Sequence, residues 1–174
     1  MSAWTVAISA GLLFLTGCTP APRDLDWDAV DTLIAEAFPG VPSLTTSDLA
    51  ARLESGLDVI LLDARDADEF AVSHLQGAHH VASDVDTASH LAASAPNALV
   101  VAYCSVGYRS AALVEQLHAR GHTNALNLEG SIFQWVTEGR PVYRGQTQVT
   151  QVHPYDPTWG ALLPEVLWSS EQRD

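Results

Sequence analysis

The sequence predicts an α/β fold that occupies most of the chain. Between residues 43 and 144, short apolar runs alternate with apolar residues at helical spacing, which is typical of strands and helices that follow each other in turn. Two of the runs, 59–62 and 99–103, are apolar or aromatic at every position, as expected for central parallel strands buried on both faces. We therefore expect one largely parallel sheet with helices on both of its faces.

Each predicted element has a recognisable start or stop. Asp24 and Asp26 stand where the N-cap and first turn of a first helix are expected, and this helix ends near Pro39 and Gly40. Thr45 or Thr46 is expected to cap a second helix, which stops at Gly56. The same criteria predict helices near 27–37, 46–53, 68–72, 86–94, 110–120 and 132–138, and strands near 59–62, 78–81, 99–103 and 125–128.

The composition excludes several classes of protein. The 174 residues suffice for one domain with short extensions, and the 47% hydrophobic content argues against a disordered chain. All 8 basic residues are arginines, and with 21 acidic residues the net charge is −13, which argues against nucleic-acid binding. The two cysteines, Cys18 and Cys104, cannot form a disulfide framework, and clustered zinc ligands are absent from the sequence. We expect neither a metal nor an organic cofactor.

Residues 1–17 resemble the signal peptide of bacterial lipoproteins. An uncharged apolar stretch, too short to span a bilayer, leads to Leu15-Thr16-Gly17-Cys18. The resemblance implies that Cys18 is lipidated and that the protein is exported and anchored at the periplasmic face of a bacterial membrane. The outer membrane is favoured over the inner one, because Thr19 rather than an acidic residue follows the cysteine.

The rest of the chain divides into four segments. Residues 18–24 are expected to be a tether, 25–42 an N-terminal helical extension, 43–144 the α/β domain and 145–174 a C-terminal extension. The last segment is rich in apolar and aromatic residues between Tyr155 and Trp168, so we expect it to pack on the domain. The alternative is a strip that binds a partner protein.

The segment CSVGYRS at 104–110 joins the strand at 99–103 to the next helix. Ligands of open parallel sheets bind at the carboxyl ends of strands, and Gly107 allows the backbone to turn its amides toward Cys104. Loop amides and a helix N-terminus favour a thiolate over a thiol, so Cys104 is the candidate nucleophile. The residues expected to bind the substrate or a persulfide are Ser105, Val106, Gly107, Tyr108, Arg109 and Ser110.

The stretch 43–143 resembles the rhodanese-like family. The resemblance is carried by DAR at 63–65, EF at 69–70, HLQGA at 74–78, CSVGYRS at 104–110, and EGSIFQW at 129–135 followed by GRPV at 139–142. It implies a five-stranded sheet and a sulfurtransferase in which Cys104 takes sulfane sulfur from a thiosulfate-like donor and passes it to cyanide or a thiol. Ser73 and Ser131 stand where the family often has glycine, which bears on the backbone rather than on the chemistry.

The resemblance also assigns supporting roles. It implies that Asp63 and Arg65 brace the loops beside the site instead of taking part in the reaction. His74 is expected to be a packed or hydrogen-bonded loop residue, because an ionised thiol needs no general base. Two roles are open for Arg109, which could orient an anionic donor or stabilise the loop.

Two alternatives compete with sulfur transfer. A phosphatase of the same fold would need a wider loop with five residues between cysteine and arginine, whereas only four separate Cys104 from Arg109. A non-catalytic module that holds sulfur or docks an unknown protein partner would keep the same loop. Persulfide formation on Cys104 distinguishes catalysis from docking.

Overall fold

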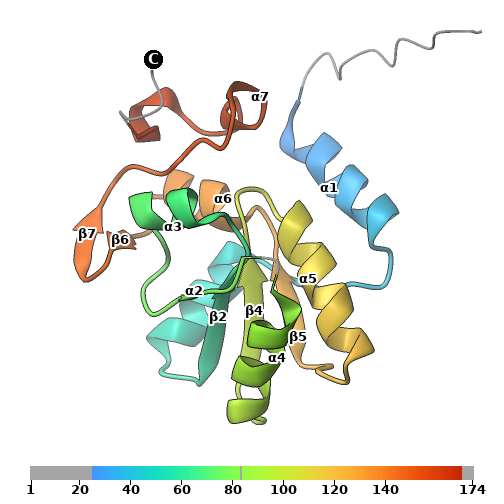
Figure 1. The fold of residues 1–174 in the computed structure, drawn as a ribbon. Coiled ribbons are helices and arrows are strands. Elements are labelled where there is room, and N and C mark those ends of the chain that lie inside the picture. Colours follow the sequence, from blue (N-terminus) through green and yellow to red (C-terminus); the bar gives the residue numbers. More distant parts are fainter. Residues whose placement is uncertain (1–24, 83, 170–174) are drawn as a thin grey trace, which may run out of the picture.

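The computed structural model describes residues 25–82 and 84–169, so the predicted signal peptide, Cys18 and the tether lie outside the described residues. Figure 1 shows an α/β architecture with a short two-stranded hairpin and a C-terminal extension. The helices are α1 (Trp27–Ala37), α2 (Thr46–Glu54), α3 (Ala67–Val72), α4 (Val85–Ser94), α5 (Tyr108–Ala119), α6 (Ser131–Thr137) and α7 (Pro157–Gly160), with a 3-10 turn at Glu165–Leu167. The strands are β1 (Ser43–Leu44), β2 (Val59–Asp63), β3 (His79–His80), β4 (Leu99–Tyr103), β5 (Ala125–Leu128), β6 (Val142–Arg144) and β7 (Thr147–Val149).

Five of the strands form one parallel sheet in the order β1-β5-β4-β2-β3. The central strand β4 pairs with β2 along its whole length, with Leu61 opposite Val101, and with β5, where Val101 lies opposite Leu126. The prediction of a largely parallel five-stranded sheet is therefore confirmed. Because all five strands run the same way, their carboxyl ends meet at one edge of the sheet, where the loops of an α/β protein can build a site.

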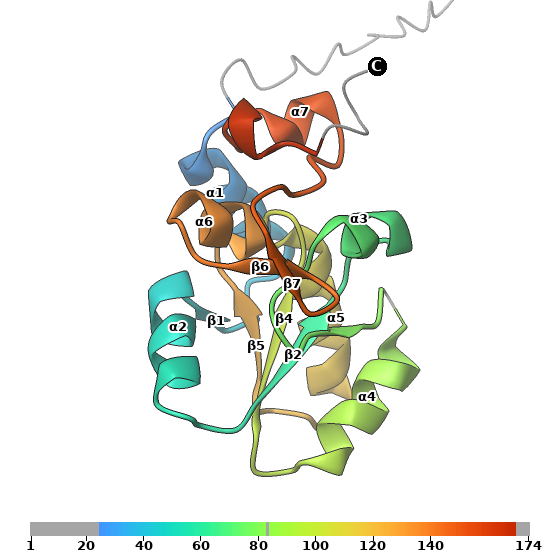
Figure 2. The ribbon, with the colours of Figure 1, turned by 90° about the vertical axis from the view of Figure 1, so that its left-hand side faces the viewer.

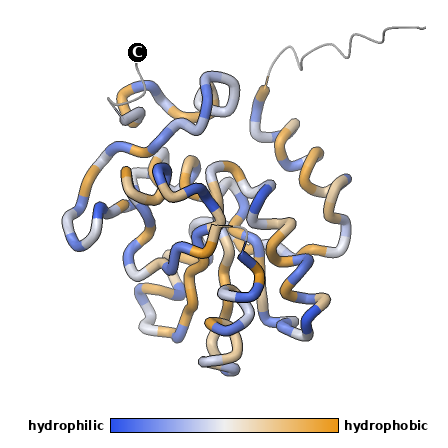
Figure 3. Tube along the Cα trace, viewed as in Figure 1, coloured by the Kyte–Doolittle hydropathy of each residue, from blue (hydrophilic) through white to orange (hydrophobic). Residues whose placement is uncertain are grey.

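Two apolar layers cover the two faces of the sheet. Alternate residues of β4 enter different layers: Val101 and Tyr103 belong to one, Val100 and Ala102 to the other. Helices α2 and α6 lie on the first face and α4 and α5 on the second, as Figure 2 shows. The near-continuous apolar character of β2 and β4, which is visible in the hydropathy trace of Figure 3, follows from this double burial.

The C-terminal extension packs at the carboxyl edge of the sheet. The hairpin β6-β7 follows α6, and the chain then crosses beyond α3 and α6 to reach α7 (Figures 1 and 2). Val152 and Leu163 are fully buried in the same apolar layer as α2 and α6, and Val152 pairs with Trp168 in an isolated parallel bridge. Burial of these side chains fixes the path of the extension over the loops that follow β2 and β4.

The helices of the described region are short. Within residues 25–82 and 84–169, no helix has the length and apolar character needed to cross a membrane. The longest is α5, with 12 residues.

Candidate active site at Cys104

Cys104 follows the last residue of β4 and begins the loop that ends at α5. Its side chain is buried, and the Gly107 amide donates a hydrogen bond to Sγ over 3.1 Å. Gly107 has a φ of +112° at the N-cap of α5, a conformation that side chains with a Cβ rarely adopt. The glycine thus turns its amide back toward the sulfur at the start of a helix, where positive partial charge accumulates.

The start of α6 supports this loop from behind. The Cys104 amide donates to Ser131 Oγ over 3.1 Å, and that hydroxyl donates to the Leu128 carbonyl. The amides of Ile132 and Phe133 donate to the carbonyls of Cys104 and Ser105. The loop around the sulfur is therefore held through its backbone, and Ser131 has a φ of +49°, in the left-handed region that favours glycine.

A second support holds the start of α5. Ser110 Oγ donates to the Asn127 side-chain carbonyl over 2.7 Å, and both residues are buried. This bond ties the first turn of α5 to β5, the neighbouring strand. Buried hydroxyl and amide groups of this kind are costly to leave unpaired, so the pair fixes the direction in which α5 leaves the loop.

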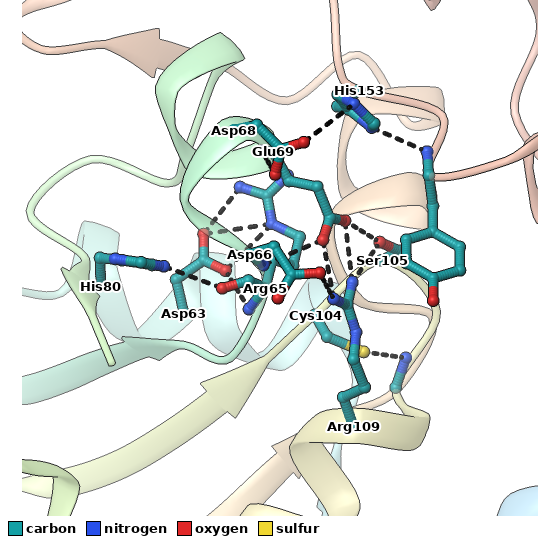
Figure 4. A network of polar contacts seen from close by, with 12 residues as sticks. Asp63, Arg65, Asp66, Asp68, Glu69, His80, Cys104, Ser105, Arg109 and His153 are labelled. Atoms are coloured by element: carbon teal, nitrogen blue, oxygen red, sulfur yellow. Dashed lines mark hydrogen bonds and ion pairs between the residues drawn. The ribbon is translucent and has the colours of Figure 1, made fainter. Parts of the chain in front are cut away.

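Arg109 lies next to the sulfur in a network with a buried carboxylate (Figure 4). Its two terminal nitrogens bind the two oxygens of Glu69 at 2.7 and 2.8 Å. Ser105 Oγ donates to the same carboxylate over 2.8 Å, and the Asp66 amide donates to it over 2.9 Å. Glu69 therefore links α3 to both ends of the Cys104 loop, and the bidentate geometry is the strong form of an arginine–carboxylate pair.

The charges of this pair stabilise each other. Burial raises the pKa of Glu69, but the hydrogen bond and positive charge of Arg109 outweigh it, and the pKa lies below its ordinary value of 4.5. Burial also opposes the charge on Arg109, yet the hydrogen bonds that Arg109 donates to Glu69 and then the negative charge of Cys104 raise its pKa above the ordinary value. Both groups are therefore charged at neutral pH, and Arg109 places a cation beside the sulfur.

Asp63 and Arg65 form a separate buried ion pair at the end of β2, 2.7 Å apart and fully inaccessible. The Arg65 guanidinium also donates to the Ser73 carbonyl over 2.6 Å, which holds the segment that follows α3. Neither residue lines the pocket at Cys104. His74 stacks on Phe70 with ring centroids 4.3 Å apart, and its Nδ1 lies 3.0 Å from the Leu75 carbonyl oxygen. The Arg65 and His74 contacts therefore hold the chain segments that follow β2 and α3.

A pocket of about 130 Å³ opens above the sulfur. Cys104, Ser105, Val106, Tyr108 and Arg109 line it from the loop after β4 and the start of α5. Tyr155 and Trp159 line it from the C-terminal extension. The Arg109 guanidinium lies 4.8 Å from the centre of the Tyr155 ring, so the extension packs directly on the network of the loop.

The sequence does not predict four residues of this site. Glu69 stands out in the sequence only as part of EF at 69–70, and Ser131 only as a serine at a position where the rhodanese-like family often has glycine. For Tyr155 and Trp159 the sequence predicts packing on the domain, with no relation to Cys104. The turn-rich sequence HPYDP at 153–157 could have indicated a bend that presents aromatic residues, but it does not specify their target.

The described residues offer no metal centre. Within 25–82 and 84–169, no group of three or more His, Cys, Asp or Glu side chains is arranged to hold a metal ion. The chemistry available at the pocket is that of a thiol, backbone amides, hydroxyl groups and an ion-paired arginine. A cysteine beside an arginine and at a helix N-terminus is suited to nucleophilic attack.

Comparison with known proteins identifies the family to which the fold belongs. The family described as the rhodanese-like domain matches residues 45–138. A probable adenylyltransferase/sulfurtransferase MoeZ of Mycobacterium tuberculosis is 29% identical over 100 residues, which cover 57% of this chain and 26% of that protein. A tRNA uridine(34) hydroxylase of Xanthomonas oryzae is 35% identical over 108 residues, which cover 56% of this chain and 42% of that protein.

The solved structures give the same result for the fold. The crystal structure of a thiosulfate sulfurtransferase from Pseudomonas aeruginosa has a TM-score of 0.58 and 22% sequence identity, and covers 78% of this chain and 26% of that chain. The chain spans less than half the length of the curated relatives described above. The family match at 45–138 contains strands β2 to β5 and the Cys104 loop.

Proposed function

Because the chain belongs to the rhodanese-like family, we propose that it is a sulfurtransferase that forms a persulfide on Cys104. The donor supplies a sulfane sulfur, and a thiophilic acceptor such as cyanide or a thiol takes it up. The single observation that carries the proposal is the Gly107 amide, which donates to Sγ of a cysteine that lines an open pocket. An amide donor stabilises negative charge on sulfur, which both the thiolate and the persulfide carry.

The reaction is two nucleophilic displacements. In the first, the Cys104 thiolate attacks the outer sulfur of the donor. A bond forms between Sγ and that sulfur, the bond to the rest of the donor breaks, and the leaving group keeps the electron pair. In the second, the acceptor attacks the outer sulfur of the persulfide and Cys104 leaves as the thiolate. No net oxidation or reduction of the protein occurs over the cycle.

The residues of the loop have different parts in this cycle. Cys104 is the nucleophile, and the Gly107 amide donates to its Sγ. Ser105 and Arg109 hold the loop through Glu69. Ser110 holds α5 through Asn127, while Asp63 and Arg65 brace the neighbouring loop.

The phosphatase alternative is disfavoured by the state of Arg109. A phosphatase arginine binds the phosphate with its own guanidinium, but both terminal nitrogens of Arg109 are bound to Glu69. The short loop and this ion pair favour transfer of a single sulfur atom over binding of a tetrahedral oxyanion.

Intact-mass spectrometry tests the proposal. We expect an adduct of ~32 Da, one sulfur atom, after incubation with a sulfane-sulfur donor, and its loss on addition of cyanide. Cys104→Ser is the matched control and gives no adduct. If the wild-type protein stays unmodified with every donor, the protein is a non-catalytic module, and a docking function replaces the proposed one.

The location of the protein is a separate proposal. We propose that Cys18 is lipidated and that the mature protein is anchored at the periplasmic face of a membrane, on the sequence of residues 1–18 alone. Growth with an alkyne-tagged fatty acid, followed by detection of the tag on the protein, tests this. Cys18→Ala abolishes the label if the proposal is correct, and label that persists in Cys18→Ala contradicts it.

A further inference from the structure

The wall opposite the Cys104 loop is aromatic. Tyr155 and Trp159 line the pocket from the C-terminal extension, and Val106 and Tyr108 line it from the loop. Trp159 is partly exposed and packs on the apolar layer that contains Val106. Apolar carbon therefore makes up most of the surface that lines the pocket.

The charge of the pocket does not suit a dianion. Among the described residues that line it, Arg109 is the one cation. Its guanidinium is bound to both oxygens of Glu69, lies 3.3 Å from the Asp66 carboxylate, and has one face against Tyr155. One positive and two negative side chains give this cluster a charge of −1, before the thiolate of the proposed reaction is counted.

From these two observations we propose that the sulfur donor is an organic molecule that carries its sulfane sulfur on an apolar group, such as an aromatic thiosulfonate, and not inorganic thiosulfate. The inference rests on the proposed function and specifies its donor. Thiosulfate brings two negative charges to a thiolate without a free cation to offset them. A thiosulfonate brings one, and its carbon group can lie against Tyr155 and Trp159.

The displacement balances for such a donor. The Cys104 thiolate attacks the outer sulfur of the thiosulfonate R–SO2–S⁻, and a bond forms between the two sulfur atoms. The bond between the outer sulfur and the sulfonyl sulfur breaks, and the sulfinate R–SO2⁻ leaves with the electron pair. The total charge is −2 on both sides.

Three donors separate the effects of charge and of ring contact. Thiosulfate is a dianion, methanethiosulfonate a monoanion with a small apolar group, and benzenethiosulfonate a monoanion with an aromatic ring. The rate of adduct formation on Cys104 is measured by quenched-flow intact mass for each. Each rate is divided by the rate of the same donor with free cyanide, which corrects for intrinsic reactivity. We expect corrected rates at least about tenfold higher for benzenethiosulfonate than for thiosulfate.

The variant Trp159→Ala tests the aromatic wall. We expect it to lower the benzenethiosulfonate rate about fivefold and to change the methanethiosulfonate rate by less than about twofold, while Trp159→Phe keeps most of the preference. Trp168→Ala is the matched control, since it removes a tryptophan of the extension that lines a different hollow. The ratio of the two thiosulfonate rates within one variant stays interpretable even if the extension loosens.

The results distinguish failure of the donor assignment from failure of the proposed sulfurtransferase function. A corrected thiosulfate rate equal to or above that of benzenethiosulfonate, or an unchanged benzene-to-methane ratio in Trp159→Ala, overturns the donor assignment. In both cases Cys104 still forms an adduct, so the sulfurtransferase proposal survives. Absence of an adduct with all three donors instead removes the proposed function itself.

Discussion

Glu69 offers the sharpest test of how the Cys104 loop is held. The carboxylate is almost completely buried and binds Arg109, Ser105 and the Asp66 amide. Glu69→Gln keeps the size of the side chain but removes its charge and turns one acceptor into a donor that faces Arg109. We expect the variant to lower both the stability of the protein and the rate of persulfide formation on Cys104.

The magnitude follows from the burial of the two partners. Removing one partner of a fully buried ion pair costs about 3–5 kcal/mol, and a single hydrogen bond to a charged group contributes about 1.5–3 kcal/mol. The Arg109 side chain is 25% exposed, so water compensates part of its lost partner. We expect the free energy of unfolding to fall by about 2 kcal/mol, which lowers Tm by about 6 °C in a chain of this length.

Urea unfolding at pH 7, with thermal unfolding as a second measurement, gives this difference. Asp66→Asn is the matched control: the Asp66 side chain is 69% exposed, and asparagine keeps the N-cap of α3, so we expect a loss below about 0.5 kcal/mol. In the double variant Glu69→Gln/Arg109→Gln, the cost should be well below the sum of the two single costs. If Glu69→Gln costs no more than Asp66→Asn, the ion pair does not support the loop and the reasoning fails.

Three further predictions concern the same region. The pKa of Glu69 is lowered in the folded protein, so its contribution to stability is present above pH 4.5 and is lost as the pH falls through the folded pKa. Urea unfolding from pH 6 to 3 should therefore show that the higher stability of the wild type over Glu69→Gln disappears, and a constant difference would contradict this. Gly107→Ala should lower the free energy of unfolding by about 2 kcal/mol and slow adduct formation, because φ is +112° and a Cβ would lie 3.1 Å from the Ile34 side chain. In the control Gly121→Ala, φ is +91° but no atom lies within 4 Å of the added Cβ, so the variant should lose stability and keep the adduct rate. Leu163→Ala should lower the free energy of unfolding, measured in urea, by about 3 kcal/mol because the Leu163 side chain is 2% exposed. The control Val166→Ala, at a residue that is 78% exposed, should change it by less than about 0.5 kcal/mol, and equal effects would mean that the extension does not pack as described.

The elements that the sequence predicted well are those with a strong local signal. Buried strands such as β2 and β4 are apolar on both faces, and helices such as α2 begin at a residue whose side chain caps them, as Thr45 does by accepting from the Asp48 amide. Strand β1 has only two residues, too few to show a period, and the hairpin β6-β7 is polar and half-exposed. Local patterns therefore predicted the sheet but not its short edge or the hairpin.

The site was predictable only where neighbours in sequence build it. Cys104 and Gly107 are three residues apart, so the contact between Sγ and the amide follows from the loop itself. Glu69 reaches Arg109 across 40 residues, and nothing in the local sequence distinguishes it from the other acidic residues of the chain. Its partner is set by the tertiary packing of α3 against the loop after β4, which periodicity does not encode.

Tyr155 and Trp159 line the pocket beside Cys104 but lie outside the segment that matches the family. The family match covers residues 45–138, and strands β2 to β5, the Cys104 loop and Glu69 all lie within it. The aromatic wall lies outside it, on an extension held by buried Val152 and Leu163. A protein that shares residues 45–138 but has another extension would keep the nucleophile and its amide donor and lose the surface against which an apolar donor lies. On the proposed function, the shared domain therefore supplies the chemistry of sulfur transfer, and the extension selects the molecule from which the sulfur comes.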